Sequence, residues 1–145
     1  MLTDIVPELE KLTHIFSQAT APTFFLGSVA AFASLMSTRL AMVLGRIRQL
    51  NGIPADDPQR VHLKADVDRL KRRARLLAVA MRDSLIAGIC ATILLAIIFV
   101  SDFFGLSHAY GAGFLFMLAT AALGKGLVNF VRECGIQLAE ADEYD

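Results

Sequence analysis

Residues 84–101 read SLIAGICATILLAIIFVS, eighteen positions in a row without a charged side chain. An uncharged apolar run of this length is just sufficient to cross the hydrocarbon core of a bilayer as a helix. Two further runs have the same character: APTFFLGSVAAFASLMST at 21–38 and AYGAGFLFMLATAALG at 109–124. The sequence therefore predicts an all-α polytopic membrane protein with three transmembrane helices.

The composition favours the same class of protein. The chain has 145 residues, which is the length of one domain, and 55% of them are hydrophobic while 19% are charged. A soluble domain usually carries about 25% charged residues. The composition and the grouping of the apolar residues argue against a soluble enzyme.

The residues before the first run predict a short amphipathic helix over 2–18. Its apolar side chains recur with helical spacing, at Leu2, Ile5, Val6, Leu9, Leu12, Ile15 and Phe16. Such a helix lies either on the bilayer or on the protein itself. The opposite face is acidic rather than rich in Lys and Arg, which favours packing on the protein's own helices. Ala21-Pro22 predicts a break before the next helix begins.

The first two transmembrane helices are predicted to extend beyond the bilayer as an antiparallel helical hairpin. The first covers 21–50, and Asn51-Gly52 opens a hairpin tip at 51–58. The second covers 59–101. Its first part carries a seam of apolar residues that alternate by four and three: Leu63, Val67, Leu70, Ala74 and Leu77.

The third transmembrane helix is predicted over 109–132. The remaining residues, 133–145, contain five acids and no base. This composition predicts an acidic tail that is disordered.

The distribution of charge predicts the orientation. Ten of the fourteen basic residues lie between positions 39 and 75, and the short loop at 102–109 has none. Because basic residues are retained on the cytoplasmic side, we expect the hairpin to be cytoplasmic. The N-terminus is then outside, and the C-terminus is cytoplasmic.

The segment TAPTFFLGSVAAFASLMSTRLAMVLGRIRQL at 20–50 resembles a bacterial membrane-protein family catalogued as domain of unknown function 2721. The resemblance rests on a Pro-led apolar helix followed by the pattern RLxxVxxRIRxL. That pattern is formed here by Arg39, Leu40, Val43, Arg46, Ile47, Arg48 and Leu50. The three-span layout also matches, so the resemblance covers most of the chain. It implies a small protein of the bacterial inner (cytoplasmic) membrane and carries no known reaction or catalytic residue.

Four charges are predicted to lie at one depth, at the cytoplasmic edge of the hydrocarbon: Arg39, Arg82, Asp83 and Lys125. Charges at that depth are costly unless they are paired or reach the interface. The simpler interpretation is snorkelling bases with an Arg39–Asp83 or Arg82–Asp83 ion pair. The alternative is a cationic ring near a pore mouth, or a lipid-headgroup site, in an oligomer.

Small and hydroxyl side chains form a stripe along the first span. The candidate pore-lining residues on it are Thr23, Gly27, Ala31, Ser34 and Thr38. Small residues let helices approach closely in a membrane, and a hydroxyl-lined pore face is the alternative interpretation. The other two spans carry similar faces, so we expect a homo-oligomer.

A basic stretch beside the membrane provides candidate contacts to anionic lipid or to a partner: Arg69, Arg72, Arg73 and Arg75. It has no accompanying aromatic platform, so we expect no nucleic acid to bind. The three histidines and two cysteines have no metal-site spacing. We therefore expect no metal and no cofactor.

Two functions follow from these features. The first is a homo-oligomeric, ion-conducting, channel-like assembly in the lipid bilayer. The alternative is a non-conducting membrane scaffold or sensor whose hairpin docks a cytosolic protein partner through the 63–77 seam. A membrane enzyme has no supporting residue constellation, so we expect no enzymatic activity.

Overall fold

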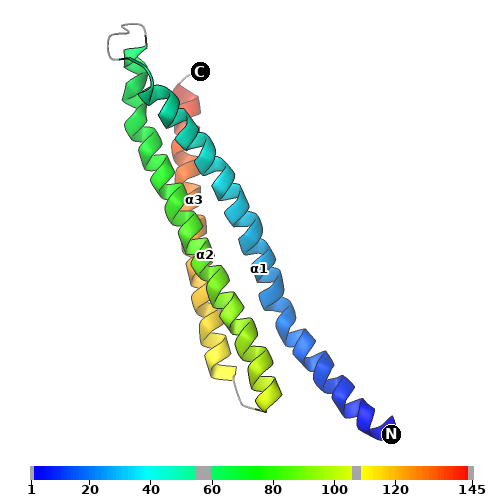
Figure 1. Cartoon of the computed structure of the whole chain (residues 1–145). Coiled ribbons are helices and arrows are strands. Elements are labelled where there is room, and N and C mark those ends of the chain that lie inside the picture. The colour runs from blue at the N-terminus through cyan, green and yellow to red at the C-terminus, as the bar shows by residue number, and fades with distance from the viewer. Residues whose placement is uncertain (1, 55–59, 106–108, 144–145) are drawn as a thin grey trace. The chain divides into compact units, whose positions relative to one another are not determined.

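The computed structural model of the chain describes residues 2–54, 60–105 and 109–143. It contains three long α-helices and one 3-10 helix (Figure 1): α1 (Leu2–Asn51), η1 (Val61–Asp66), α2 (Val67–Phe104) and α3 (Ala109–Glu143). The described residues include no strand. The predicted all-α class is confirmed.

Each long helix contains a segment that is long and apolar enough to cross a membrane. These candidate spans lie within Leu9–Asn51, His62–Phe104 and Tyr110–Ala139. A hydrocarbon core of about 30 Å needs about 20 helical residues, so all three helices are longer than a crossing requires. The prediction of three helices capable of spanning a membrane is confirmed.

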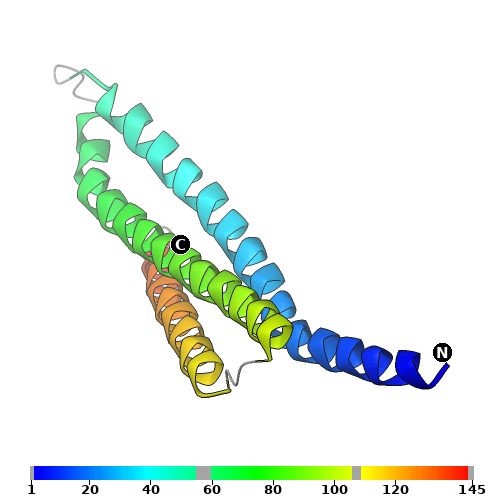
Figure 2. The same ribbon diagram turned by 60° about the horizontal axis from the view of Figure 1, so that its bottom comes forward.

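Helix α1 runs without interruption through Pro7 and Pro22 (Figure 2). The predicted break at Ala21-Pro22 does not occur, and residues 2–18 do not form a separate helix. A proline inside a helix costs about 3 kcal/mol in water. Helices in membranes tolerate proline because neighbouring groups satisfy the carbonyl that it leaves unpaired.

Three residues of the apolar stripe near the start of α1 are exposed: Leu9, Leu12 and Phe16 are 56%, 50% and 65% exposed. The predicted packing on the protein's own helices does not occur at these three positions. The side chains at the start of the stripe, at 2–6, lie outside the described residues.

Glycines mark the ends of α1 and α2. The Gly52 amide donates to the Arg48 carbonyl at 3.1 Å, and the Gly105 amide donates to the Asp102 carbonyl at 3.3 Å. Gly105 has φ +66°, a left-handed conformation that glycine adopts without steric cost. Most of the predicted hairpin tip, residues 55–58, and the predicted start of the second helix at residue 59 lie outside the described residues.

The chain divides into two compact units. The first unit comprises Met1–Ala31 and Leu85–Leu123, and the second comprises Phe32–Ser84 and Gly124–Asp145. Every Lys and Arg except Lys11 belongs to the second unit. The first unit is therefore nearly free of basic residues, and the second unit is the basic part of the chain.

In the first unit, α1 and α2 approach each other closely. A Cβ atom placed on Gly88 would lie 3.2 Å from Val29 Cγ1. Phe25 and Phe116 join α1 to α3 with ring centroids 5.8 Å apart. Large apolar side chains remain on the outside of this unit, including Phe24, Phe103 and Phe114. Such a surface suits contact with lipid or with another transmembrane helix.

The second unit has its own apolar core, built from α1 and α2. The residues that α1 buries recur every seven positions: Met36, Val43 and Leu50. Those from α2 alternate by three and four: Val67, Leu70, Ala74 and Leu77. This is the spacing of helices that interlock as knobs into holes. The predicted 63–77 seam is a packing face of the core, and docking of a partner through it is therefore wrong.

Helix α3 adds a third helix to this unit. Phe130 packs against the core, Glu133 is fully buried, and the helix continues to Glu143. The prediction that residues 133–145 are disordered is wrong for the residues that the structure describes. What the sequence predicted as a two-helix hairpin is a three-helix bundle, because one face of α3 remains packed beyond Arg132.

Candidate functional site

Glu133 lies at the centre of an ion-pair cluster in the second unit. Its side chain is 0% exposed. Arg73 donates to Oε1 through Nε at 3.0 Å and through Nη2 at 2.9 Å. Arg39 Nη1 lies 3.3 Å from Oε2. A buried carboxylate is costly unless it is paired and hydrogen-bonded, and here both oxygens face guanidinium groups.

Arg39 makes further contacts with α3. Its Nη1 donates to Cys134 Sγ at 3.1 Å and its Nη2 donates to Gln137 Oε1. Its guanidinium carbon lies 5.2 Å from the centroid of the Phe130 ring, a cation–π distance. Arg39 therefore pairs with Glu133, and the predicted Arg39–Asp83 ion pair is wrong.

Asp83 forms a second, separate cluster. Its side chain is 4% exposed, with Lys125 Nζ 3.3 Å from Oδ2 and Arg82 Nη2 3.4 Å from Oδ1. The predicted Arg82–Asp83 pair is present. The Lys125 contact is an ion pair, and Oδ2 has no hydrogen-bond partner among the residues that the structure describes. Both bases are about two-thirds exposed, and they reach from the surface to a buried acid.

The four charges predicted to form one band therefore belong to two separate ion-pair clusters, which differ in how exposed their bases are. Around Glu133 the bases are largely buried, whereas around Asp83 they are about two-thirds exposed. In both clusters the bases lie against a carboxylate. A single protomer therefore presents bases that are each paired with an acid: Arg39 with Glu133, and Arg82 and Lys125 with Asp83.

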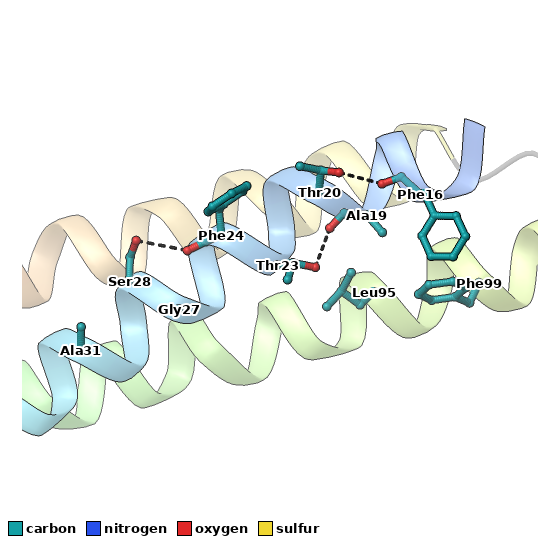
Figure 3. Close-up of a pocket in the computed structure, with 10 residues that line it drawn as sticks. All are labelled: Phe16, Ala19, Thr20, Thr23, Phe24, Gly27, Ser28, Ala31, Leu95 and Phe99. Atoms are coloured by element: carbon teal, nitrogen blue, oxygen red, sulfur yellow. Dashed lines mark hydrogen bonds between the residues drawn. The ribbon is translucent and has the colours of Figure 1, made fainter. Parts of the chain in front are cut away.

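The candidate pore-lining residues are divided between the two units. Thr23, Gly27 and Ala31 line a groove of about 680 Å³ in the first unit, opposite Leu95 and Phe99 of α2 (Figure 3). Ser34 and Thr38 belong to the second unit and are exposed.

The hydroxyl groups in the groove are hydrogen-bonded within α1. Thr23 Oγ1 donates to the Ala19 carbonyl at 2.7 Å, and Ser28 Oγ donates to the Phe24 carbonyl at 3.1 Å (Figure 3). A hydroxyl that bonds to the carbonyl four residues earlier can sit in apolar surroundings. The groove is consequently a mainly apolar surface with small residues, suited to close approach of a helix or an acyl chain.

The basic stretch on α2 does not lie on one surface. Arg72 and Arg75 are exposed and Arg69 is half-buried, while Arg73 is held against Glu133. Lys71 forms an exposed ion pair with Asp68 at 3.6 Å.

The roles of Glu133 and Gln137 were not predicted from the sequence. The spacing of Gly126, Phe130, Glu133 and Gln137 contains the signal, because steps of four, three and four follow one face of a helix. The acidic composition of residues 133–145 concealed this helical periodicity.

The described residues contain no group of three or more His, Cys, Asp or Glu side chains that could hold a metal ion.

Comparison with known proteins leads to one family. No curated protein and no solved structure matches the chain. A family described as "Protein of unknown function (DUF2721)" matches residues 19–142. The match includes most of α1, all of α2 and nearly all of α3, so it covers both ion-pair clusters. The chain belongs to this family, as the resemblance in α1 indicated.

Proposed function

We propose that the protein is an integral protein of the bacterial inner membrane that acts as a non-conducting scaffold. It holds a charged three-helix bundle at the cytoplasmic membrane surface, where the bundle docks a protein partner. The observation that carries this proposal is that every basic residue except Lys11 belongs to a unit with its own buried core and its own internal ion pairs. A chain that acted only within the bilayer would have no need of such a unit.

The groove in the first unit supports a role as an anchor. Its hydroxyl groups donate their hydrogens to the backbone of α1, so they are satisfied in apolar surroundings without a ligand. The small residues of the groove suit helix packing between protomers, and a homo-oligomer is part of this proposal.

The charge distribution supports the proposed orientation. The second unit contains every Lys and Arg except Lys11, and it also contains the end of α3. The positive-inside rule therefore assigns the bundle and the C-terminus to the cytoplasm and the N-terminus to the outside.

The docking face must be an exposed one, because the 63–77 seam is buried. Arg72, Arg75, Ala78 and Arg82 follow one another at helical spacing on α2 and are all exposed. We expect this basic face to contact an acidic surface on the partner.

Site-specific photo-crosslinking in native membranes tests this proposal. A photoreactive residue at Ala78 leaves the neighbouring arginines in place, and the same residue at Ile89, 60% exposed in the first unit, is the control. We expect Ala78, and not Ile89, to form an adduct with one cytosolic protein, and Arg72→Glu with Arg75→Glu to remove it. Adducts only with lipid or with another copy of the chain would contradict the proposal.

A homo-oligomeric ion-conducting assembly is the second candidate function. It is favoured by the exposure of Ser34 and Thr38, which could line an axis between protomers. Ion flux into liposomes decides between the two candidates. The scaffold predicts the flux of empty liposomes. Flux above that level which disappears in Ser34→Leu with Thr38→Leu would establish conduction instead.

A further inference from the structure

Arg82 and Lys125 bring two positive charges to one point on the surface of the second unit. Both bases contact the same carboxylate: Arg82 Nη2 lies 3.4 Å from Oδ1 of Asp83, and Lys125 Nζ lies 3.3 Å from Oδ2. Because the two oxygens belong to one carboxylate, the two cations lie within reach of a single small anion. We refer to Arg82, Lys125 and Asp83 as the Asp83 cluster.

The Asp83 cluster has two positive charges and one negative charge. Neither base has a further ion pair or hydrogen bond among the described residues. The acids whose side chains are not described are too distant to supply one. On α3 the first of them is Glu140, fifteen residues beyond Lys125, which is about 22 Å along a helix. The segment 55–59 precedes the start of α2, sixteen residues or about 24 Å of helix before Asp83. Residues 1–8 are more than twenty residues of α1 away from the second unit.

Both bases are open to a ligand from outside the chain. The side chains of Arg82 and Lys125 are 65% and 64% exposed, whereas that of Asp83 is 4% exposed. An approaching anion therefore meets the bases rather than the acid. Arg82 donates to Asp83 through Nη2, and its other N–H groups have no partner in the described part of the chain.

The Asp83 cluster lies where the uncharged runs of two helices end. Asp83 is the last charged residue of α2 before the run 84–101, and Lys125 is the first charged residue of α3 after the run 109–124. These two ends meet at Gly126, since a Cβ atom on it would lie within 3.1 Å of two atoms of α2. Runs of this length are just sufficient to cross the hydrocarbon core. In a chain that spans the membrane, the charges beside them lie at the level of the lipid headgroups.

A phosphate group matches two cations that are held at this depth. A guanidinium group is planar and can donate two parallel hydrogen bonds to phosphate oxygens, and a lysine ammonium group binds phosphate as a point charge. Basic side chains beside a membrane also attract anionic lipids through the negative potential of the surface. Anionic phospholipids present their phosphate groups at the depth where the two uncharged runs end.

We propose that Arg82 and Lys125 together bind the phosphate group of an anionic phospholipid at the membrane surface. This site rests on the membrane location proposed above, but it requires neither the protein partner nor ion conduction. The variants that test the partner, Arg72→Glu and Arg75→Glu, leave Arg82 and Lys125 in place. The lipid site and the docking of a partner can therefore fail separately.

Lipid-dependent thermal unfolding of the full chain in an uncharged maltoside detergent tests the site. Short-chain phosphatidylglycerol, the same concentration of short-chain phosphatidylcholine, and inorganic phosphate are titrated in three separate arms. Arg82→Gln and Lys125→Gln each remove one base of the Asp83 cluster. Arg132→Gln is the matched control, because Arg132 is an exposed base about two turns further along α3 that does not contact Asp83.

We expect phosphatidylglycerol to give a saturable rise in the unfolding temperature that exceeds the rise with phosphatidylcholine. The concentration that gives half of this rise should increase about tenfold in Arg82→Gln and in Lys125→Gln, because each variant loses a charge-assisted contact to the phosphate group. Arg132→Gln should bind phosphatidylglycerol as the natural chain does.

Three results would overturn the proposal. The first is that phosphatidylglycerol gives no saturable rise beyond that of phosphatidylcholine. The second is that inorganic phosphate gives the same saturable rise, since that would assign the bases to a soluble anion. The third is that Arg132→Gln weakens binding as much as Lys125→Gln, since that would show general attraction to a basic surface.

Discussion

At Glu133, one carboxylate on α3 holds an arginine from each of the other two helices. Replacing a whole buried ion pair by apolar residues is often neutral, but removing one partner leaves the other charge buried and uncompensated. Glu133 is therefore the single residue on which the three helices of the second unit depend most directly. Asp83 is also buried, but its two bases are about two-thirds exposed and can return to water.

These two acids make a matched pair for mutation. We expect Glu133→Gln to lower the free energy of unfolding by about 3–5 kcal/mol, because Arg39 and Arg73 stay largely buried. We expect Asp83→Asn to lower it by less than about 1 kcal/mol, because Arg82 and Lys125 become hydrated. Denaturant unfolding of the full chain in detergent, followed by circular dichroism, measures both. An equal loss in the two variants would show that burial of the bases does not decide the cost.

At the scale of elements, α1 buries one residue in seven within the second unit. Met36 is 0% exposed in that core, whereas its neighbour Leu35 is 48% exposed. Because only one residue in seven is buried, much of the apolar surface of α1 in this unit remains outside the core.

Truncation of these neighbours tests the packing of α1. Met36→Ala should destabilise the chain by about 2–5 kcal/mol, because it opens a cavity among buried side chains. Leu35→Ala removes a similar volume from the surface and should have a much smaller effect in the same unfolding assay. If Leu35→Ala costs as much, α1 uses a different face from the one that the structure shows.

Helices α2 and α3 approach each other closely at Gly126. A Cβ atom there would lie 3.0 Å from the Ala80 carbonyl oxygen and 3.1 Å from Ser84 Oγ. A Cβ atom on Gly135 of the same helix would meet no atom within 4 Å. The approach at Gly126 thus requires a residue without a side chain, and Gly135 does not face this contact.

We expect Gly126→Val to force the two helices apart and to destabilise the chain by about 1–3 kcal/mol. Gly135→Val makes the same change in intrinsic helix propensity without a steric conflict. The thermal unfolding temperatures of the two variants should therefore differ, with Gly126→Val lower. Equal temperatures would mean that α2 and α3 are not in close contact at Gly126.

At the scale of the whole molecule, the charge distribution and the division into units coincide. The apolar unit contains Lys11 as its single base, and the basic unit contains the ends of α1 and α3 and the start of α2. All of the strongly basic segments should therefore remain on the same side of a membrane.

Reporter fusions test this orientation. A fluorescent protein that matures only in the cytoplasm should be bright at the C-terminus, and alkaline phosphatase should be active at the N-terminus, because basic segments stay inside. Neutralising the exposed Arg72 and Arg75 should lower the fraction of correctly oriented chains. An N-terminus inside the cell would contradict the assigned orientation.

Properties that depend on local composition could be read from the sequence. The runs at 21–38, 84–101 and 109–124 predicted three helices able to cross a membrane, because the length of an apolar run relative to the bilayer is a one-dimensional property. The apolar seam at 63–77 was also visible in the sequence, because the period of an apolar stripe follows from helix geometry. That the seam packs in the core of the second unit and does not face a partner was not visible there.

The tertiary structure alone decided which faces meet. The sequence could not assign Arg39 to Glu133 rather than to Asp83, since these residues are far apart in the chain and are brought together by the packing of α3. It also could not show that an acidic segment remains helical, because helicity beyond Arg132 depends on burial of one face rather than on average composition. The two ion-pair clusters exist because three helices, packed together, place their charges against one another.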